Sequence, residues 1–180
     1  MNVRSMLVFC AMLAVLPAGA QDGPVLKEGE ADVNTLVDAL TPKKPVRMRG
    51  FKIVREDAGT PAPAAAPAKA HLLITFDTNS ANLSERAKTS LDAVGQALGS
   101  DKLSGARFAI EGHADPRGGA AANLKLSQLR AQSVRDYLVN QLQIDAARLD
   151  AVGKGAQEPM NKTNPQAPEN RRVTIVNLTR

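Results

Sequence analysis

Cysteine and aromatic residues are scarce in this chain of 180 residues. It contains a single cysteine, Cys10, no tryptophan, and only 3% aromatic residues. Because Cys10 lies in an N-terminal apolar segment, loss of that segment leaves no thiol for a disulfide, a thiolate metal site or a cysteine nucleophile. The few aromatic side chains offer little surface for stacking bases, so we expect no nucleic-acid binding.

Long hydrophobic runs are also missing. The apolar run from Met6 to Leu16 is shorter than the ~20 residues that span a bilayer. Arg4 precedes this run and small residues follow it at positions 18–20, a pattern typical of a secretory signal peptide over residues 1–20. We therefore expect export, cleavage before Gln21, and no transmembrane segment in the mature chain. Cys10 lies inside the apolar run rather than at the cleavage site, which argues against a lipid anchor.

Residues 21–57 form a leader with two features. Its apolar residues recur at helical spacing, which predicts one short amphipathic helix: Val33, Leu36, Val37 and Leu40. Six basic residues and one acid follow, and the basic residues are Lys43, Lys44, Arg47, Arg49, Lys52 and Arg55. We expect the leader to lie outside the domain. Its basic segment is open to three roles: a solvated tail, docking to an envelope protein or an anionic surface, or an edge strand added to a partner sheet.

Residues 58–70 are rich in Ala and Pro, which predicts a semi-rigid linker. A domain of residues 71–180 follows, in which strands and helices alternate. Strands are predicted at 71–76, 106–112, 149–152 and 172–178. One helix is predicted between Ser84, which can cap it, and Gly99, which ends it, and a second at about 119–142. This β-α-β-α-β-β order predicts an α/β two-layer sandwich, with the helices on one face of a small mixed sheet.

The long second helix has an unusual inward face. At 100° per residue, Asn123, Ser127 and Arg130 share a line with Val134 and Leu138. An arginine facing a sheet must pair with an anion or stay hydrated. Asp115 lies just before the helix, so two interpretations are open. Either Asp115 and Arg130 form a salt bridge within the domain, or they grip a ligand that carries both an ammonium and a carboxylate.

Several motifs together resemble the OmpA-like peptidoglycan-binding domain over residues 72–178. They are "ITFDTNSANLSERAKTSLDAVGQAL", "IEGHADPRGG", "NLKLSQLRAQSVRDYLV", "VGKGAQEPM" and "NRRVTIV". The resemblance implies that Asp115 and Arg130 bind the diaminopimelate residue of the wall's stem peptide. It also implies a periplasmic, wall-associated protein of a Gram-negative envelope, with a position peripheral to the outer membrane left open. Ala114 stands where the family often has threonine, and "GHADPRGG" is similar to the form in peptidoglycan-associated lipoproteins.

Other polar residues are candidates for accessory roles. Asp77 and Asn79 follow the first strand of the domain and are candidates for the same cleft or for a turn. Asn123, like Ser127, is a candidate for shaping the site or for fixing the start of the long helix. Arg171 matches the family's arginine near the last strand, where ligand contact and carboxylate pairing are both open.

Catalytic groups are few. His71 and His113 are the only histidines, so a zinc site with three protein ligands or a Ser-His-Asp triad is poorly supplied. We expect a binding protein without metal or cofactor rather than an enzyme. A wall hydrolase and an adaptor, whose basic leader binds an envelope partner, are the alternatives.

Overall fold

The computed structural model describes residues 23–43, 66–74, 76 and 80–179. The strands are β1 (Val25–Lys27), β2 (Lys69–Leu73), β3 (Phe108–His113), β4 (Leu149–Gly155) and β5 (Val173–Asn177). The helices are α1 (Val33–Leu40), α2 (Glu85–Leu98) and α3 (Ala120–Asn140), with short 3-10 helices η1 (Ala146–Arg148) and η2 (Pro168–Asn170). The predicted signal peptide, most of the basic segment and most of the linker lie outside the described residues.

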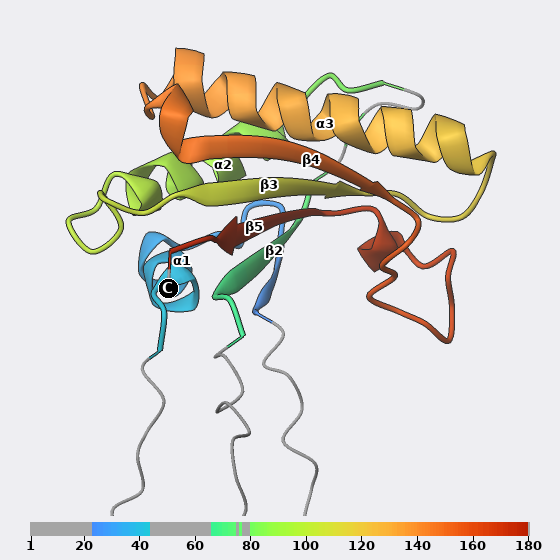
Figure 1. Cartoon of the computed structure of the whole chain (residues 1–180), viewed down its shortest axis with the longest axis horizontal. Coiled ribbons are helices and arrows are strands. Elements are labelled where there is room, and N and C mark those ends of the chain that lie inside the picture. The colour runs from blue at the N-terminus through green and yellow to red at the C-terminus, as the bar shows by residue number, and fades with distance from the viewer. Residues whose placement is uncertain (1–22, 44–65, 75, 77–79, 180) are drawn as a thin grey trace, which may run out of the picture.

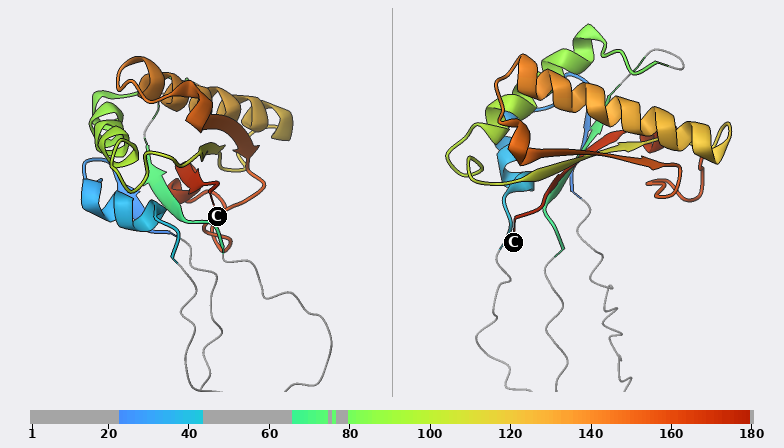
Figure 2. Two further views of the ribbon diagram at one scale, coloured as in Figure 1. Left: turned by 60° about the vertical axis from the view of Figure 1, so that its left-hand side comes forward. Right: turned by 45° about the horizontal axis from the view of Figure 1, so that its top comes forward.

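All five strands form one mixed sheet in the order β1-β2-β5-β3-β4. β5 lies between β2 and β3 and is antiparallel to both, whereas β1 is parallel to β2 and β4 is parallel to β3. Figure 1 shows α2 and α3 on one side of this sheet, and Figure 2 shows α3, in orange, crossing the strands in two further views. The predicted two-layer α/β sandwich is confirmed, and the predicted β-α-β-α-β-β order holds from β2 onward, with β1 and α1 preceding it.

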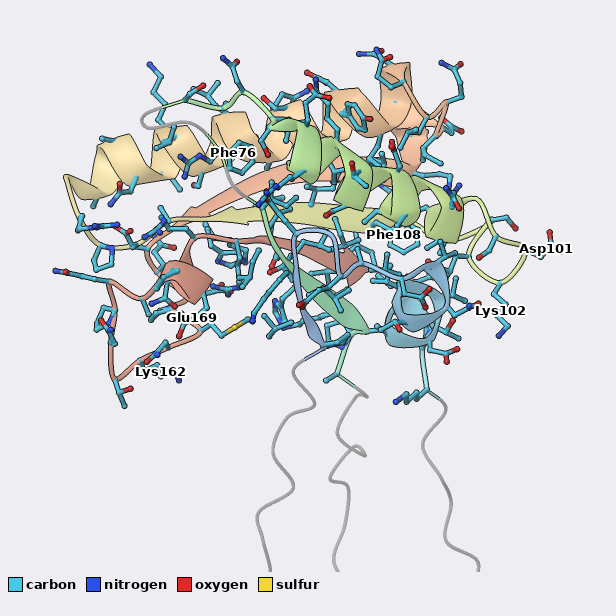
Figure 3. All side chains as sticks on the ribbon, turned by 180° about the vertical axis from the view of Figure 1, so that it is seen from behind. Phe76, Asp101, Lys102, Phe108, Lys162 and Glu169 are labelled. Atoms are coloured by element: carbon cyan, nitrogen blue, oxygen red, sulfur yellow. The ribbon has the colours of Figure 1, made fainter. Side chains whose placement is uncertain are left out.

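The core fills the space between these helices and the sheet. Leu91 of α2, Phe108 and Ile110 of β3, and Val134 and Leu138 of α3 are fully buried there. Figure 3 shows Phe108 beneath α2. None of the helices within the described ranges combines the length and hydropathy that a membrane crossing requires.

Local signals set the limits of α2. The side chain of Ser84 caps its first turn, because Oγ accepts a hydrogen bond from the backbone N–H of Ala87 at 3.1 Å. Gly99 ends the helix, as predicted. The inward face of α3 also follows the predicted spacing, since its buried residues are Asn123, Ser127, Arg130, Ala131, Val134 and Leu138.

The N-terminal segment corrects one expectation. Residues 21–57 were expected to lie outside the domain, which is wrong for residues 23–43. β1 extends the sheet beside β2 and α1 packs against α2, β2 and β5. Leu36 and Leu40 are fully buried in the same core, and the Asn177 side-chain amide donates to the Leu40 carbonyl at 2.8 Å.

The physical reason is that a short amphipathic helix is marginal alone and gains its stability from packing its apolar face. α2, β2 and β5 supply the apolar surface that α1 covers. The Ala/Pro-rich segment therefore connects α1 to β2 of one sheet instead of separating two units.

Candidate functional site

A tight loop after β3 carries Asp115. The backbone N–H of Ala114 donates to the carbonyl of Gly155 in β4 at 2.8 Å, which ties the start of the loop to the sheet. Gly118 has φ +93°, a conformation that favours glycine, and the chain then enters α3. Asn123 Nδ2 donates to the Asp115 carbonyl at 3.0 Å. Asn123 thus fixes the loop that presents the aspartate.

The N-terminal half of α3 lies very close to the sheet. A Cβ atom at Gly112 of β3 would collide with the Ser127 carbonyl, so only glycine permits this approach. Ser127 Oγ accepts from the Gly155 N–H at 2.9 Å and donates to the Leu124 carbonyl at 2.8 Å. Ser127 therefore joins the helix to β4 and has no hydroxyl proton left for the cavity.

Asp115 is buried and held by two arginines. Its Oδ2 accepts from Arg117 Nη2 at 2.6 Å and from Arg171 Nη1 at 2.9 Å. Its Oδ1 accepts from the backbone N–H and the Nε of Arg117, each at 3.1 Å. Hydrogen bonds from Arg117, supported by Arg171, hold the pKa of Asp115 far below its usual range and outweigh burial, which raises it. Asp115 is therefore a carboxylate anion at neutral pH.

Arg130 reaches the same region from α3. It is 9% exposed, its Nε donates to the Ser80 carbonyl at 3.1 Å, and its guanidinium lies 4.8 Å from the centre of the Phe76 ring. Figure 3 shows Phe76 beside α3. Burial and the nearby charge of Arg171 lower the pKa of Arg130. Among the described residues, the ion pairs of Asp115 are to Arg117 and Arg171 rather than to Arg130.

These side chains line one cavity of about 570 Å³. Its polar lining residues are Asp115, Arg117, Asn123, Arg130 and Arg171, and its apolar ones are Leu73, Ile74, Phe76, Ala114, Leu126 and Pro168. Three arginines against one aspartate give the lining a net positive charge. A ligand with carboxylate groups matches this charge, and an ammonium group matches the aspartate.

The predicted site residues are thus brought together in part. Asp115 and Arg130 line the cavity with Ala114, Asn123 and Arg171, and Arg171 pairs with a carboxylate. Asp77 and Asn79 lie outside the described residues. The sequence interpretation missed the other lining residues, which are Arg117 and the apolar Leu73, Ile74, Phe76, Leu126 and Pro168. A signal for Arg117 was present, because an aspartate often bonds the backbone two residues later in a turn.

The candidate catalytic groups do not meet. His113 is buried with Nε2 3.9 Å from Glu111 Oε2, and burial together with the charge of Arg172 lowers its pKa to about 3. Ser127 is bonded to backbone groups instead. Within the described part of the chain, no group of three or more His, Cys, Asp or Glu side chains is placed to hold a metal ion.

Comparison with known proteins agrees with this architecture. The model of the OmpA family matches residues 75–172. The chain is 38% identical to outer membrane protein Omp38 of Acinetobacter baumannii over 104 residues, which are 57% of this chain and 29% of that protein. It is 34% identical to the peptidoglycan-associated lipoprotein of Pseudomonas aeruginosa over 102 residues, 56% of this chain and 58% of that protein. The match therefore spans less than two thirds of either relative.

Two solved structures share the fold. One is the cell wall anchor of the T6SS from Pseudomonas aeruginosa, with a TM-score of 0.53, 28% identity, and coverage of 65% of this chain and 85% of that one. The other is the peptidoglycan-associated lipoprotein from Burkholderia pseudomallei, with a TM-score of 0.50, 28% identity, and coverage of 58% and 87%.

Proposed function

We propose that this chain, which belongs to the OmpA family, binds the cell wall. On this proposal the protein holds peptidoglycan non-covalently through the diaminopimelate residue of the stem peptide. Support comes from two relatives whose names state an association with peptidoglycan or the cell wall. The cavity at Asp115 and Arg130 supplies the chemistry.

One observation carries the proposal: Asp115 and Arg130 line one cavity without an ion pair to each other. The distal centre of meso-diaminopimelate carries an ammonium and a carboxylate. Asp115 would form an ion pair with the ammonium, and the guanidinium of Arg130 would donate two parallel hydrogen bonds to the carboxylate. Within the described residues, the hydrogen bond of Arg130 comes from Nε, which leaves the Nη groups for a ligand.

The test is sedimentation of the full-length protein with purified sacculi that contain diaminopimelate. We expect Asp115→Ala and Arg130→Ala each to weaken binding about tenfold or more, because each removes a charge-assisted contact of ~1.5–3 kcal/mol. Arg107→Ala is the matched control, since Arg107 pairs with Asp150 on an exposed surface. Folded site variants that sediment like the parent would exclude this site.

Arg130→Lys sharpens the geometry of the test. Lysine keeps the positive charge but not the two-pronged donor, so we expect binding to weaken despite the same net charge. Sacculi whose stem peptide carries lysine at the third position lack the distal carboxylate and should bind poorly to the parent. Equal binding to both wall types would exclude diaminopimelate as the recognised residue.

The proposed location is the periplasm, associated with the wall. The predicted signal peptide supports it, and Edman sequencing of the mature protein should begin at Gln21.

A further proposal is that the leader binds an envelope partner. Because β1 and α1 belong to the fold, this proposal is restricted to the basic residues that follow α1. Incubation of the protein with sacculi should release no muropeptides, whereas release would favour the wall-hydrolase alternative.

A further inference from the structure

We propose that Arg117 is an internal competitor that occupies Asp115 in the free protein and leaves it when the ligand's ammonium enters. This inference rests on the proposed function and adds an affinity-setting residue to the same site. It follows from how the aspartate is bonded. Both carboxylate oxygens accept hydrogen bonds from Arg117, which covers the anion that a cationic ligand needs.

Arg117 rather than Arg171 is the group that leaves. The side chain of Arg117 is 58% exposed and that of Arg171 is 40% exposed, so the first is the better hydrated partner once released. Arg117 lies in the short loop between β3 and α3, whereas Arg171 lies between η2 and β5. When the guanidinium of Arg117 swings away, Asp115 keeps the Arg117 backbone N–H and Arg171 as donors.

The exchange conserves charge at the aspartate. A guanidinium leaves and an ammonium takes its place, so Asp115 remains paired in both states and no buried charge is stranded. The competition is limited because the Arg117 side chain is 58% exposed and is hydrated once it leaves Asp115, so we expect it to change the dissociation constant by no more than about fivefold. A ligand without an ammonium group cannot displace Arg117 and meets a covered aspartate. Arg117 thereby selects for the ammonium of diaminopimelate as well as setting the affinity.

The test measures the dissociation constant of a disaccharide-tripeptide muropeptide that contains meso-diaminopimelate. Arg117→Ala frees Asp115 from the competitor, so we expect the dissociation constant to fall about two- to fivefold. Arg117→Lys keeps a weaker competitor, and its value should lie between those of the parent and Arg117→Ala. Arg107→Ala removes one arginine from an exposed ion pair elsewhere and should leave the constant unchanged. A rise in the constant for Arg117→Ala would show that Arg117 holds the ligand, and an unchanged constant would show that it does not compete; either result overturns the proposal.

The failure of this inference is distinguishable from failure of the proposed function. If Asp115→Ala and Arg130→Ala lose sacculus binding while Arg117→Ala binds more weakly than the parent, the site stands and the competitor does not. In the Asp115→Ala background, adding Arg117→Ala should give no gain, because Arg117 acts only through the aspartate. A gain in that background contradicts the inference.

An NMR titration of the unaltered protein tests the exchange without any variant. The Arg117 side-chain Nε–H signal should shift to that of a solvated arginine as muropeptide is added, and an unmoved signal at saturation overturns the exchange.

Discussion

The two halves of α3 face the same sheet with opposite chemistry. The N-terminal half places Asn123, Ser127 and Arg130 inward, and the C-terminal half places Val134 and Leu138 there. Each polar group in the first half has a backbone partner at 2.8–3.1 Å, so its burial is not penalised as an unpaired group would be. The second half has no such bonds from its inward side chains, which are apolar and fully buried.

On the proposed function, the two halves of α3 serve stability and ligand binding separately. The apolar half packs Val134 and Leu138 into the core, where both side chains are fully buried. The polar half is bonded to β4 through Ser127 and places Asn123 and Arg130 at the cavity. Substitutions in the two halves should therefore affect different measurements.

The largest expected effect is on stability in the apolar half. Leu138→Ala should lower the free energy of unfolding by about 2–5 kcal/mol, because it leaves a cavity among fully buried side chains. Urea denaturation measures the loss, and sacculus binding below the unfolding transition should be retained. Leu129→Ala is the control on the same helix, since Leu129 is 49% exposed, and it should change stability by no more than about 0.5 kcal/mol. Equal losses for both would contradict the assignment of the core face.

The apolar half shares its core with α1, and Leu40 tests that link. Leu40→Ala should lower the unfolding free energy toward the lower end of about 2–5 kcal/mol, because α1 has eight residues and room to shift. Val25→Ala in exposed β1 is the comparison variant and should have little effect. An unchanged denaturation curve for Leu40→Ala would show that residues 23–43 do not contribute to the stability of the fold.

A smaller effect is expected where the polar half touches the sheet, and it should appear in both measurements. Gly112→Ala introduces a Cβ atom against the Ser127 carbonyl and should cost about 1–3 kcal/mol as the helix moves. The same movement displaces Arg130, so binding to sacculi should weaken. Gly105→Ala has no atom near its added Cβ and serves as the matched control. If Gly112→Ala lowered the free energy of unfolding but bound sacculi like the parent, the polar half would contribute to stability without contributing to binding, which contradicts the division of α3 into two halves.

The smallest effect concerns the contact between α2 and α3. Tyr137 donates its hydroxyl to Asp92 Oδ1 at 2.8 Å, and burial together with that carboxylate raises the pKa of Tyr137 to about 12. Because the folded pKa lies above 10.0, the ordinary pKa of a tyrosine hydroxyl, this contribution to stability is fully present below pH 10 and is lost as pH rises through about 12. The chain has one tyrosine and no tryptophan, so absorbance titration reports Tyr137 alone. A midpoint near 10 in the folded protein would contradict the contact, and Asp92→Asn should lower the midpoint.

Much of the architecture could be read from local patterns. The Ser84 cap, the Gly99 end and the spacing along α3 each involve residues within a few positions of one another, and the structure confirms them. The strand limits were less accurate. The first predicted strand, 71–76, is observed at Lys69–Leu73, with Phe76 in an isolated bridge to Leu83. Hydrogen bonding with β5 sets where β2 begins and ends. The sequence of β2 alone does not show which strand it pairs with or in which register.

The sequence by itself determined the order of elements from β2 onward, the polar and apolar halves of α3, and the presence of Asp115 and Arg130 on neighbouring elements, because periodicity and capping act over short separations. Only the tertiary structure decided that α1 completes the core and that Asp115 pairs with Arg117 and Arg171 instead of Arg130. An amphipathic face shows that a helix must be covered, but not by what. A charge likewise shows that it needs a partner, and the choice depends on which groups the folded chain brings within reach.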